Sequence, residues 1–416
     1  MHGGLQTLDG GYFVGGSTES FGVTTLPDVY LIKTDSLGDT LWTRRYGGWN
    51  PDLCYSAQLT SDGGYIVAGS TWSYSPGGQG GYLLKLNSND DTTWTKTYGG
   101  INEDWLFSVQ QTPDQGYIIC GSTQSFGAGY WDAWLIKTDS LGDTLWTRTW
   151  GGSSWDYGLD LDQTTDGGYI IVGWTNSFGV NGSDLWLIKT DANGNTQWQK
   201  IYGDLGWDEG RVIHQLSNGG YIVAGFQEYP PGSNYSDAYL IRTDINGDSL
   251  WTKHYGYDDY DEIISSLQPT SDGGYIACGF TNAYGAGLSD VWLLKFSADT
   301  FGITEDFDFK RTTAQYSMAI SPNPFRNKTV ILFGHVESGK RIVNDDSNQA
   351  WVLKIYDVAG RLVKDYTALL SHFESDNQIN WNGSDNAGYS LPPGVYFVHL
   401  VNNDHTTIIR KVIKLE

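Results

Sequence analysis

Short runs of apolar residues separated by polar turns are the dominant pattern of the first two thirds of the chain. Residues 132–150, DAWLIKTDSLGDTLWTRTW, contain two such runs with the segment DSLG between them. Asp, Ser and Gly between runs rich in β-branched and aromatic residues predict a β-hairpin. Residues 108–123, SVQQTPDQGYIICGST, predict a second hairpin with its turn at residues 114–116. The two hairpins together predict a unit of four strands.

This unit is repeated along the chain. The segment IKTDSLGDTLWTR occurs at residues 32–44 and again at residues 136–148. The tryptophan of the fourth strand returns every 52 or 53 residues, at Trp42, Trp94, Trp146, Trp198 and Trp251. The tyrosine that opens the second strand occurs six times, at Tyr12, Tyr65, Tyr117, Tyr169, Tyr221 and Tyr275. Four strands in a period of this length predict the blade of a β-propeller.

We therefore predict an all-β protein in which residues 1–298 form a six-bladed β-propeller. The sixth blade is expected to have three strands, because no Trp-bearing strand follows Phe296. Since the chain begins within the first strand of unit one, we expect an outer strand and a signal peptide to be encoded upstream of Met1. A strand supplied from there would close the ring.

The pattern changes after residue 315. Residues 316–416 contain about seven strand-like runs that alternate with Gly and Pro turns, which predicts a small Ig-like β-sandwich. Residues 299–315 are expected to be a linker. The two parts also differ in charge: from Lys310 onward there are 12 basic and 10 acidic residues, and before it there are 13 and 38. We expect two independent domains.

The acidic composition disfavours several kinds of partner. A net charge of -23 repels phosphate backbones and anionic lipid, so nucleic-acid binding is not expected. No run reaches the ~18 apolar residues of a transmembrane helix. Cys120 and Cys278 share a blade position that other copies fill with Gly, Ala or Val, so both are expected to be small core residues. The protein is expected to be a monomer.

Asp-rich turns recur on the face of the ring that carries the tight hairpins. They are residues 35–39, 87–91, 139–143, 191–195 and 244–248. Asp, Asn and Gly are the residues that a turn with a left-handed position requires, and the spacing misses the EF-hand pattern. We expect no cofactor, and calcium binding by these loops is the alternative.

The opposite face, called the loop face here, carries the candidate ligand site. An aspartate recurs near the start of five blades, at Asp52, Asp104, Asp156, Asp208 and Asp261, which favours a structural role such as capping of backbone amides. Aromatic residues that break the repeat are better binding candidates, because packing does not demand them. They are Trp105, Trp131, Trp155, Trp207 and Tyr260. With the neighbouring Asp156, Asp208 and Asp261 they suit a sugar or peptide ligand, and sealing of blade junctions is the alternative.

Catalytic motifs are not evident. The seven histidines form no HxH or HExxH pattern, and no serine lies in a GxSxG motif. The main hypothesis is therefore a non-enzymatic surface module that binds glycan or protein. A carbohydrate-active enzyme or lectin that uses the same aromatic and acidic residues is the alternative hypothesis.

The repeat resembles two known propeller repeats through Asp139, Gly142 and Trp146. They are the Asp-box of sialidases and the Trp-docking repeat of quinoprotein dehydrogenase-like propellers, and the spacing departs from each by one residue. The resemblance implies a propeller in which the Trp packs on the neighbouring blade. It implies no activity, because neither a quinone site nor a sialidase arginine triad is present.

Residues 316–416 resemble the type IX secretion C-terminal sorting domain, which is related to the Ig-like domain of flagellar hook-capping proteins. The matching motifs are Pro322–Pro324, IYDVAGRLV at residues 355–363, Trp381–Asp385, PGVY at residues 393–396 and the terminal basic strand. A polar insertion at residues 335–349 departs from the family. The resemblance implies that the secretion machinery exports the chain to the surface or medium of a Gram-negative bacterium. It places the sorting signal at Gly394, Tyr396, Arg410, Lys411 and Lys414, and an ordinary Ig-like accessory domain is the alternative.

Overall fold

The computed structural model describes residues 4–21, 25–180, 182–233, 235–256, 259–270, 273–283, 289–296, 316–337, 340–342, 351–357, 361–366, 378–402 and 407–415. The regular structure of these residues consists of strands. They contain no helix with the length and apolar character needed to cross a membrane. The chain divides into two compact units, Met1–Phe309 and Lys310–Glu416. The expected linker at residues 299–315 lies outside the described residues.

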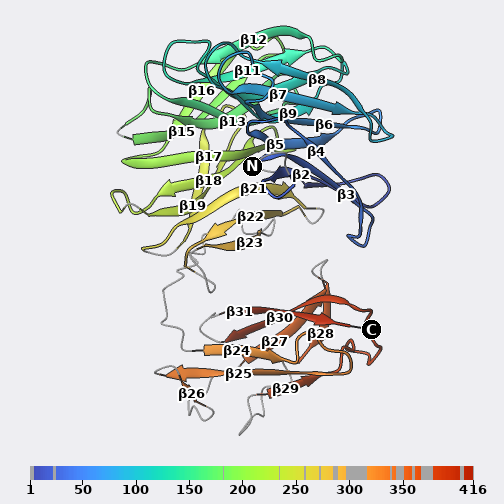
Figure 1. Ribbon diagram of the computed structural model, residues 1–416. Helices are drawn as coiled ribbons and strands as arrows, with labels where there is room; N and C mark the ends of the chain where they lie inside the picture. The colour runs from blue at the N-terminus through green and yellow to red at the C-terminus, as the bar shows by residue number, and fades with distance from the viewer. Residues whose placement is uncertain are drawn as a thin grey trace. The chain divides into compact units, whose positions relative to one another are not determined.

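The first unit is the predicted six-bladed propeller, with the blades arranged around a centre (Figure 1). Within a blade the strands are antiparallel and follow sequence order, because each hairpin returns the chain beside the strand that it has just left. Blade 1 contains β1 (Gly4–Gln6), β2 (Tyr12–Thr18), β3 (Asp28–Thr34) and β4 (Thr40–Tyr46). Blade 2 contains β5 (Asp52–Leu59), β6 (Tyr65–Thr71), β7 (Gly80–Leu86) and β8 (Thr92–Tyr98). Blade 3 contains β9 (Asp104–Gln111), β10 (Tyr117–Thr123), β11 (Asp132–Thr138) and β12 (Thr144–Trp150).

Blades 4 and 5 repeat this arrangement. Blade 4 contains β13 (Asp156–Gln163), β14 (Tyr169–Thr175), β15 (Gly182–Thr190) and β16 (Thr196–Tyr202). Blade 5 contains β17 (Gly206–Gln215), β18 (Tyr221–Glu228), β19 (Ser236–Thr243) and β20 (Ser249–Tyr255). A short parallel pairing of β15 with β17 joins these two blades into one sheet.

Neighbouring blades pack through alternating side chains. On β6, Tyr65 and Val67 face blade 1 while Ile66 and Ala68 face blade 3, so the whole strand is buried. Phe13 of blade 1 stacks on Tyr65 with the ring centroids 3.9 Å apart. Burial of one large apolar side chain contributes roughly 1.5–3 kcal/mol. The repeated junctions are therefore the main source of the propeller's stability.

The outer-strand tryptophans lie against the tyrosine of the next blade. Trp94 meets Tyr117 and Trp198 meets Tyr221, each pair with ring centroids 5.8 Å apart. This is the packing that the resemblance to known propeller repeats implied.

Blade 6 has three strands, β21 (Glu262–Pro269), β22 (Tyr275–Thr281) and β23 (Asp290–Phe296), as expected. No further strand of the described residues pairs with β23. Cys278 on β22 is exposed, whereas Cys120 at the same position of blade 3 is buried. The prediction of a core position is therefore wrong for Cys278. The reason is that its side of blade 6 is the side on which a following blade would pack.

The second unit is the predicted β-sandwich of two four-stranded sheets (Figure 1). One sheet contains β24 (Tyr316–Ser321), β25 (Thr329–Glu337), β26 (Lys340–Ile342) and β29 (Gln378–Trp381). The other contains β27 (Trp351–Asp357), β28 (Leu362–Asp365), β30 (Gly394–Asn402) and β31 (Thr407–Lys414). Phe325, Ile331, Leu353, Trp381 and Val398 belong to one buried cluster, so this unit has its own core. Residues 338–339 and 343–349 of the expected insertion lie outside the described residues.

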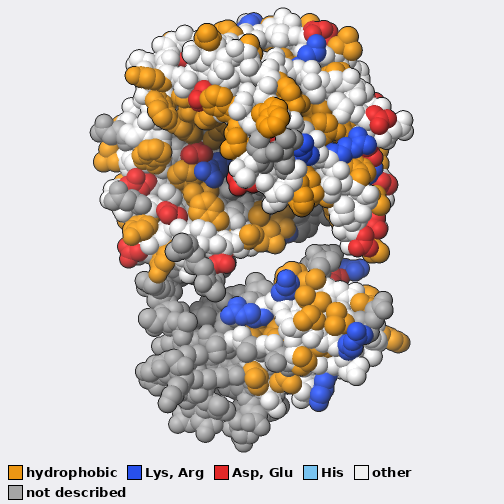
Figure 2. Space-filling view, in the orientation of Figure 1, with side chains coloured by type: hydrophobic (Ala, Val, Ile, Leu, Met, Phe, Trp, Pro, Cys, Tyr) orange, Lys and Arg blue, Asp and Glu red, His pale blue; other side chains and the backbone are white. Residues whose placement is uncertain are grey.

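The two units also differ at the surface. In Figure 2 the described surface of the C-terminal unit shows Lys and Arg side chains, whereas the propeller shows many Asp and Glu side chains as well. Hydrophobic side chains gather around the middle of the propeller face in view. The larger share of acidic side chains on the propeller matches the charge difference counted along the sequence.

Candidate functional site on the loop face

Four aromatic rings form a continuous stack at the junction of blades 3 and 4. Trp105 and Trp131 come from blade 3, and Tyr157 and Trp174 come from blade 4. Successive ring centroids are 4.4, 5.2 and 4.5 Å apart. Trp131 and Tyr157 are buried, and the other two rings are half-buried. The stack therefore seals the junction, and Trp105, whose indole N–H donates to Gln79 Oε1 at 2.8 Å, lies at its edge.

Trp155 and Trp207 are the exposed members of the predicted set. Their side chains are 49% and 61% exposed. Trp155 precedes the buried acidic residue that starts the first strand of blade 4, and its carbonyl accepts the amide of Asn176. Trp207 precedes the corresponding residue of blade 5. Two adjacent blades therefore present an accessible indole from the same loop position.

Asp156, by contrast, is fully buried and organises the start of its blade. Its Oδ2 accepts hydrogen bonds from the Gly152 amide at 2.8 Å and the Ser177 hydroxyl at 2.5 Å, and its Oδ1 accepts one from the Thr175 hydroxyl. The same donors serve the buried Asp52 and Asp104 in their blades. The recurring aspartates thus have the capping role that their recurrence favoured.

Asp208 holds the same buried position with fewer donors. Gln227 and Tyr229 replace the Thr and Ser of the other blades. Asp208 Oδ2 accepts the amide of Asp204 at 3.0 Å, and its Oδ1 has no hydrogen-bond partner among the described residues. Burial, with a smaller contribution from the negative charges of Asp204 and Asp184, raises the pKa of Asp208 to about 6.

In blade 6 the buried acidic position belongs to Glu262 and not to Asp261. Glu262 Oε1 accepts the Thr281 hydroxyl at 2.7 Å, just as Asp156 accepts Thr175. Asp261 lies one residue earlier, half-buried, and its Oδ1 accepts the amide of Ser236 at 3.0 Å. The sequence alignment of Asp261 with Asp156 was therefore wrong by one residue, because blade 6 has one extra residue in this loop. Asp261 is instead equivalent to Trp155, and Tyr260 beside it is also half-buried.

One loop position therefore carries an acidic or aromatic side chain in each of four consecutive blades. The carbonyls of Glu103, Trp155 and Asp261 accept equivalent backbone amides, which establishes that their positions correspond. With Trp207, the row along blades 3 to 6 consists of a carboxylate, two indoles and a second carboxylate. We call these four residues the loop-face row.

The residue after each buried acid also varies between blades. It is Trp105 in blade 3, which was among the sequence candidates, and Tyr157 in blade 4 and Glu209 in blade 5, which the sequence analysis overlooked. Burial raises the pKa of Glu209, whose Oε1 accepts from Arg211 Nε at 2.9 Å. The sequence did contain a signal for these residues: the position after the recurring aspartate differs from blade to blade. The aspartate is required for packing, whereas the residue after it is not.

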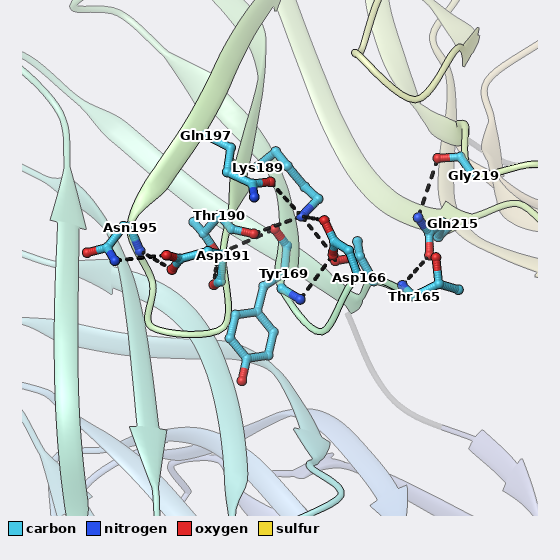
Figure 3. Close-up of polar contacts among 12 residues, drawn as sticks. Thr165, Asp166, Tyr169, Lys189, Thr190, Asp191, Asn195, Gln197, Gln215 and Gly219 are labelled. Atoms are coloured by element: carbon cyan, nitrogen blue, oxygen red, sulfur yellow. Dashed lines mark hydrogen bonds and ion pairs between the residues drawn. The ribbon is translucent and has the colours of Figure 1, made fainter.

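The hairpin face is organised by its own carboxylates (Figure 3). Asp191 Oδ1 accepts the amides of Asn193 and Asn195 at 2.9 and 2.8 Å. Lys189 Nζ lies 2.8 Å from Asp166 Oδ2 and 3.0 Å from Gln197 Oε1. These carboxylates stabilise their own turns, which is the role favoured over calcium binding. Within the described ranges, no three His, Cys, Asp or Glu side chains are grouped to hold a metal ion.

The five residues assigned to the sorting signal differ in exposure. Tyr396 is buried and its hydroxyl donates to the Pro392 carbonyl at 2.7 Å. Lys414 is also buried and donates to the Leu391 carbonyl at 2.7 Å. Gly394 starts β30, while Arg410 and Lys411 on β31 are exposed. Tyr396 and Lys414 therefore stabilise the sandwich, and Arg410 and Lys411 are the charged residues presented to solvent.

The C-terminal unit is a secretion sorting domain. Residues 319–415 match the family model described as secretion system C-terminal sorting domain. The chain is thus a propeller attached to a type IX sorting domain, and it is exported to the cell surface or the extracellular space.

Individual relatives are more distant. The regulatory protein FlaEY of Caulobacter vibrioides is 27% identical over 274 residues, which cover 58% of this chain and only 27% of that relative. The solved structure of PorZ from Porphyromonas gingivalis has 11% identity and a TM-score of 0.35, over 98% of this chain and 64% of PorZ. The propeller domain of the Trilobed protease from Pyrococcus furiosus has 7% identity and a TM-score of 0.40, over 80% of this chain and 88% of that one. Identities and TM-scores this low do not indicate that this chain shares the activity of any of these proteins.

Proposed function

We propose that the protein is an exported glycan-binding module whose propeller recognises sugar through the loop-face row. The observation that carries the proposal is the presence of two accessible indoles, Trp155 and Trp207, at one loop position of adjacent blades. An indole face packs well against the apolar face of a pyranose ring, and aromatic side chains supply large contact areas at binding sites.

The rest of the row supports this ligand class. Glu103 and Asp261 stand at the same position of the flanking blades, where carboxylates can accept hydrogen bonds from sugar hydroxyls. Trp131, Asp156 and Asp208 are buried, so in this proposal they support the site from beneath without touching the ligand. A polysaccharide chain that crosses several blades would contact the row in sequence.

A glycan array followed by calorimetry tests the proposal. Trp155→Ala and Trp207→Ala are each expected to weaken binding of the selected glycan at least tenfold, because each removes one stacking surface. Leu141→Ala is the matched control, since Leu141 is an exposed apolar residue of a hairpin turn on the other face. Equal affinity of all three variants would refute the proposal. Turnover of a polysaccharide in a hydrolase and lyase screen would favour the enzyme alternative.

We also propose that Arg410 and Lys411 are the residues of β31 that the secretion machinery reads, because they are exposed while Tyr396 and Lys414 are buried. In a host with type IX export, a double variant with Arg410→Glu and Lys411→Glu is expected to accumulate in the periplasm with its fold intact. Deletion of residues 402–416 should trap the protein as well. Export of the double variant at the normal level would show that the machinery reads other residues.

A further inference from the structure

Two buried carboxylates meet where blades 4 and 5 adjoin on the loop face. Asp184 on β15 and Asp208 on β17 are 1% and 0% exposed. Gly203 lies between them: a Cβ added to this residue would stand 2.6 Å from Asp184 Oδ1 and 2.3 Å from Asp208 Oδ2. Both carboxyl groups therefore border one small space that a larger residue than glycine would fill. Gly203 and Asp204 are exposed, so this space lies next to solvent.

The two carboxylates receive few hydrogen bonds. Asp184 Oδ2 accepts the amide of Val180 at 3.0 Å, and Asp208 Oδ2 accepts the amide of Asp204 at 3.0 Å. The Oδ1 atoms of both residues are buried and have no hydrogen-bond partner among the described residues. Burial, and to a smaller extent the negative charge of Asp204, raises the pKa of both groups. A buried carboxylate without partners is costly, so a positive charge beside this pair would stabilise the fold.

The junction of blades 1 and 2 has the same pair and obtains its positive charge from the chain. Asp28 and Asp52 meet at Gly47 in the same way. Arg45 Nη1 lies 2.5 Å from Asp28 Oδ2 and balances the charge of this pair. In blade 4 the strand pairing places Ile201 at the position of Arg45. The pair between blades 4 and 5 thus lacks the cationic side chain that the first pair has.

The junction of blades 3 and 4 stabilises its pair with hydrogen bonds. Asp132 and Asp156 together accept six hydrogen bonds. Asp184 and Asp208 together accept two from the part of the chain that the structure describes. Neither an arginine nor a set of hydroxyl donors therefore compensates the charge between blades 4 and 5.

We propose that the space between Asp184 and Asp208 is a binding site for one calcium ion. Carboxylate oxygens are preferred ligands of Ca²⁺, whose flexible shell of about six to eight oxygens also accepts backbone carbonyls and water. Because no three His, Cys, Asp or Glu side chains of the described residues are grouped to hold a metal, the two carboxylates are the charged ligands and neutral oxygens complete the shell. The ion takes the role that the Arg45 guanidinium has in blade 1. This inference goes beyond the glycan proposal and does not depend on it.

Calcium titration of the full-length protein tests the proposal. Protein stripped with EDTA is expected to bind one Ca²⁺ between blades 4 and 5 with a Kd of about 10⁻⁴ to 10⁻³ M, measured by calorimetry. The ion should raise the Tm by several degrees, because it binds only the folded chain, and Mg²⁺ should raise it less. Absence of both effects at about 10 mM Ca²⁺ would refute the proposal. A larger response to Mg²⁺ would overturn the assignment to calcium.

The cation-free protein behaves differently with pH. In EDTA, protonation of Asp208 relieves the repulsion that the ion would otherwise neutralise. Unfolding measurements of the Asp208 titration are therefore made in EDTA.

Variants locate the site. Asp184→Asn and Asp208→Asn are each expected to weaken Ca²⁺ binding at least tenfold, because each removes one charged ligand. Asp244→Asn is the matched control, since Asp244 organises an Asp-rich turn on the hairpin face. Its calcium affinity should equal that of the parent chain. Parent-like binding by the first two variants, or loss of binding in the control alone, would overturn the proposal.

A further variant decides the case in which loss of a carboxylate disturbs the fold. Ile201→Arg introduces the residue that blade 1 has at this position, and Ile201 is 40% exposed, so the longer side chain can be accommodated. The variant is expected to raise the Tm in EDTA and to remove the calcium response, because the guanidinium occupies the place of the ion. An undiminished calcium response in Ile201→Arg would contradict the proposal.

Discussion

The junction of blades 3 and 4 and the junction of blades 4 and 5 descend from the same repeat and differ in their buried carboxylate. Asp156 accepts hydrogen bonds from two hydroxyls and two amides, whereas Asp208 has lost both hydroxyl donors and keeps an oxygen without a partner in the described structure. A buried charge that is fully hydrogen-bonded stabilises, and one that is not costs free energy. The fold therefore tolerates divergence at blade 5.

The divergent junction is also the one that presents the most exposed indole of the loop-face row. Trp207, Glu209, Gln227 and Tyr229 all depart from the residues of the other blades. A position that no longer takes part in the hydrogen bonds around the buried acid can change to a residue that binds a ligand. We therefore expect ligand binding at blade 5, whereas the other blades keep the residues of the structural repeat.

The largest expected effect is the difference between removing the two carboxylates. Asp156→Ala should lower the free energy of unfolding by about 3–5 kcal/mol, because it removes the buried acceptor of four hydrogen bonds. Asp208→Ala removes an underpaired charge and should cost less than about 1 kcal/mol. Urea unfolding followed by tryptophan fluorescence measures both. Similar losses in the two variants would show that the junctions are energetically alike.

The second effect concerns pH. The pKa of Asp208 is raised to about 6, above its unfolded value of about 3.9, so its contribution to stability is present below pH 4 and is lost as pH rises through 6. Asp208→Asn removes this titration. The variant's stability relative to the parent should therefore increase between pH 4 and 7 by about 2–3 kcal/mol, from a shift of about two pKa units.

Unfolding curves at several pH values, compared pairwise, test this prediction. Asp160, whose pKa desolvation also raises to about 6, is present in both proteins and cancels in the difference. A constant difference across the range would mean that Asp208 titrates normally in the folded protein.

The smallest effect contrasts an interior blade with the last one. Cys120→Ser places a hydroxyl in a closed junction and should cost about 1–2 kcal/mol, while Cys278→Ser at the open side of blade 6 should change stability by less than about 0.5 kcal/mol. A thiol reagent added to the native protein is expected to label Cys278 and to spare Cys54 and Cys120. Protection of Cys278 would indicate that the side of blade 6 is covered in solution.

The sequence by itself determined the strands, the repeat and the number of blades. These properties are local. The alternation of apolar residues, the Asp-Gly turns and the recurrence of Trp146 and Tyr117 can be recognised without knowledge of tertiary contacts. The sorting domain was identifiable for the same reason, because its motifs lie in short continuous segments. The sequence also predicted that the recurring aspartates are structural.

Only the tertiary structure decided which of the candidate side chains are accessible. Trp131 and Trp155 break the repeat equally, yet the first is buried in a stack and the second is exposed. Trp131 is covered by Trp105 from a distant strand of its own blade and by Tyr157 from the next blade. Glu262 was distinguished from Asp261 by the hydroxyl of Thr281, nineteen residues away. Cys278 was mispredicted because burial at its position requires a following blade, and none packs there among the described residues. Each of these properties depends on contacts between distant segments, and a periodic pattern contains no information about whether its next copy is present.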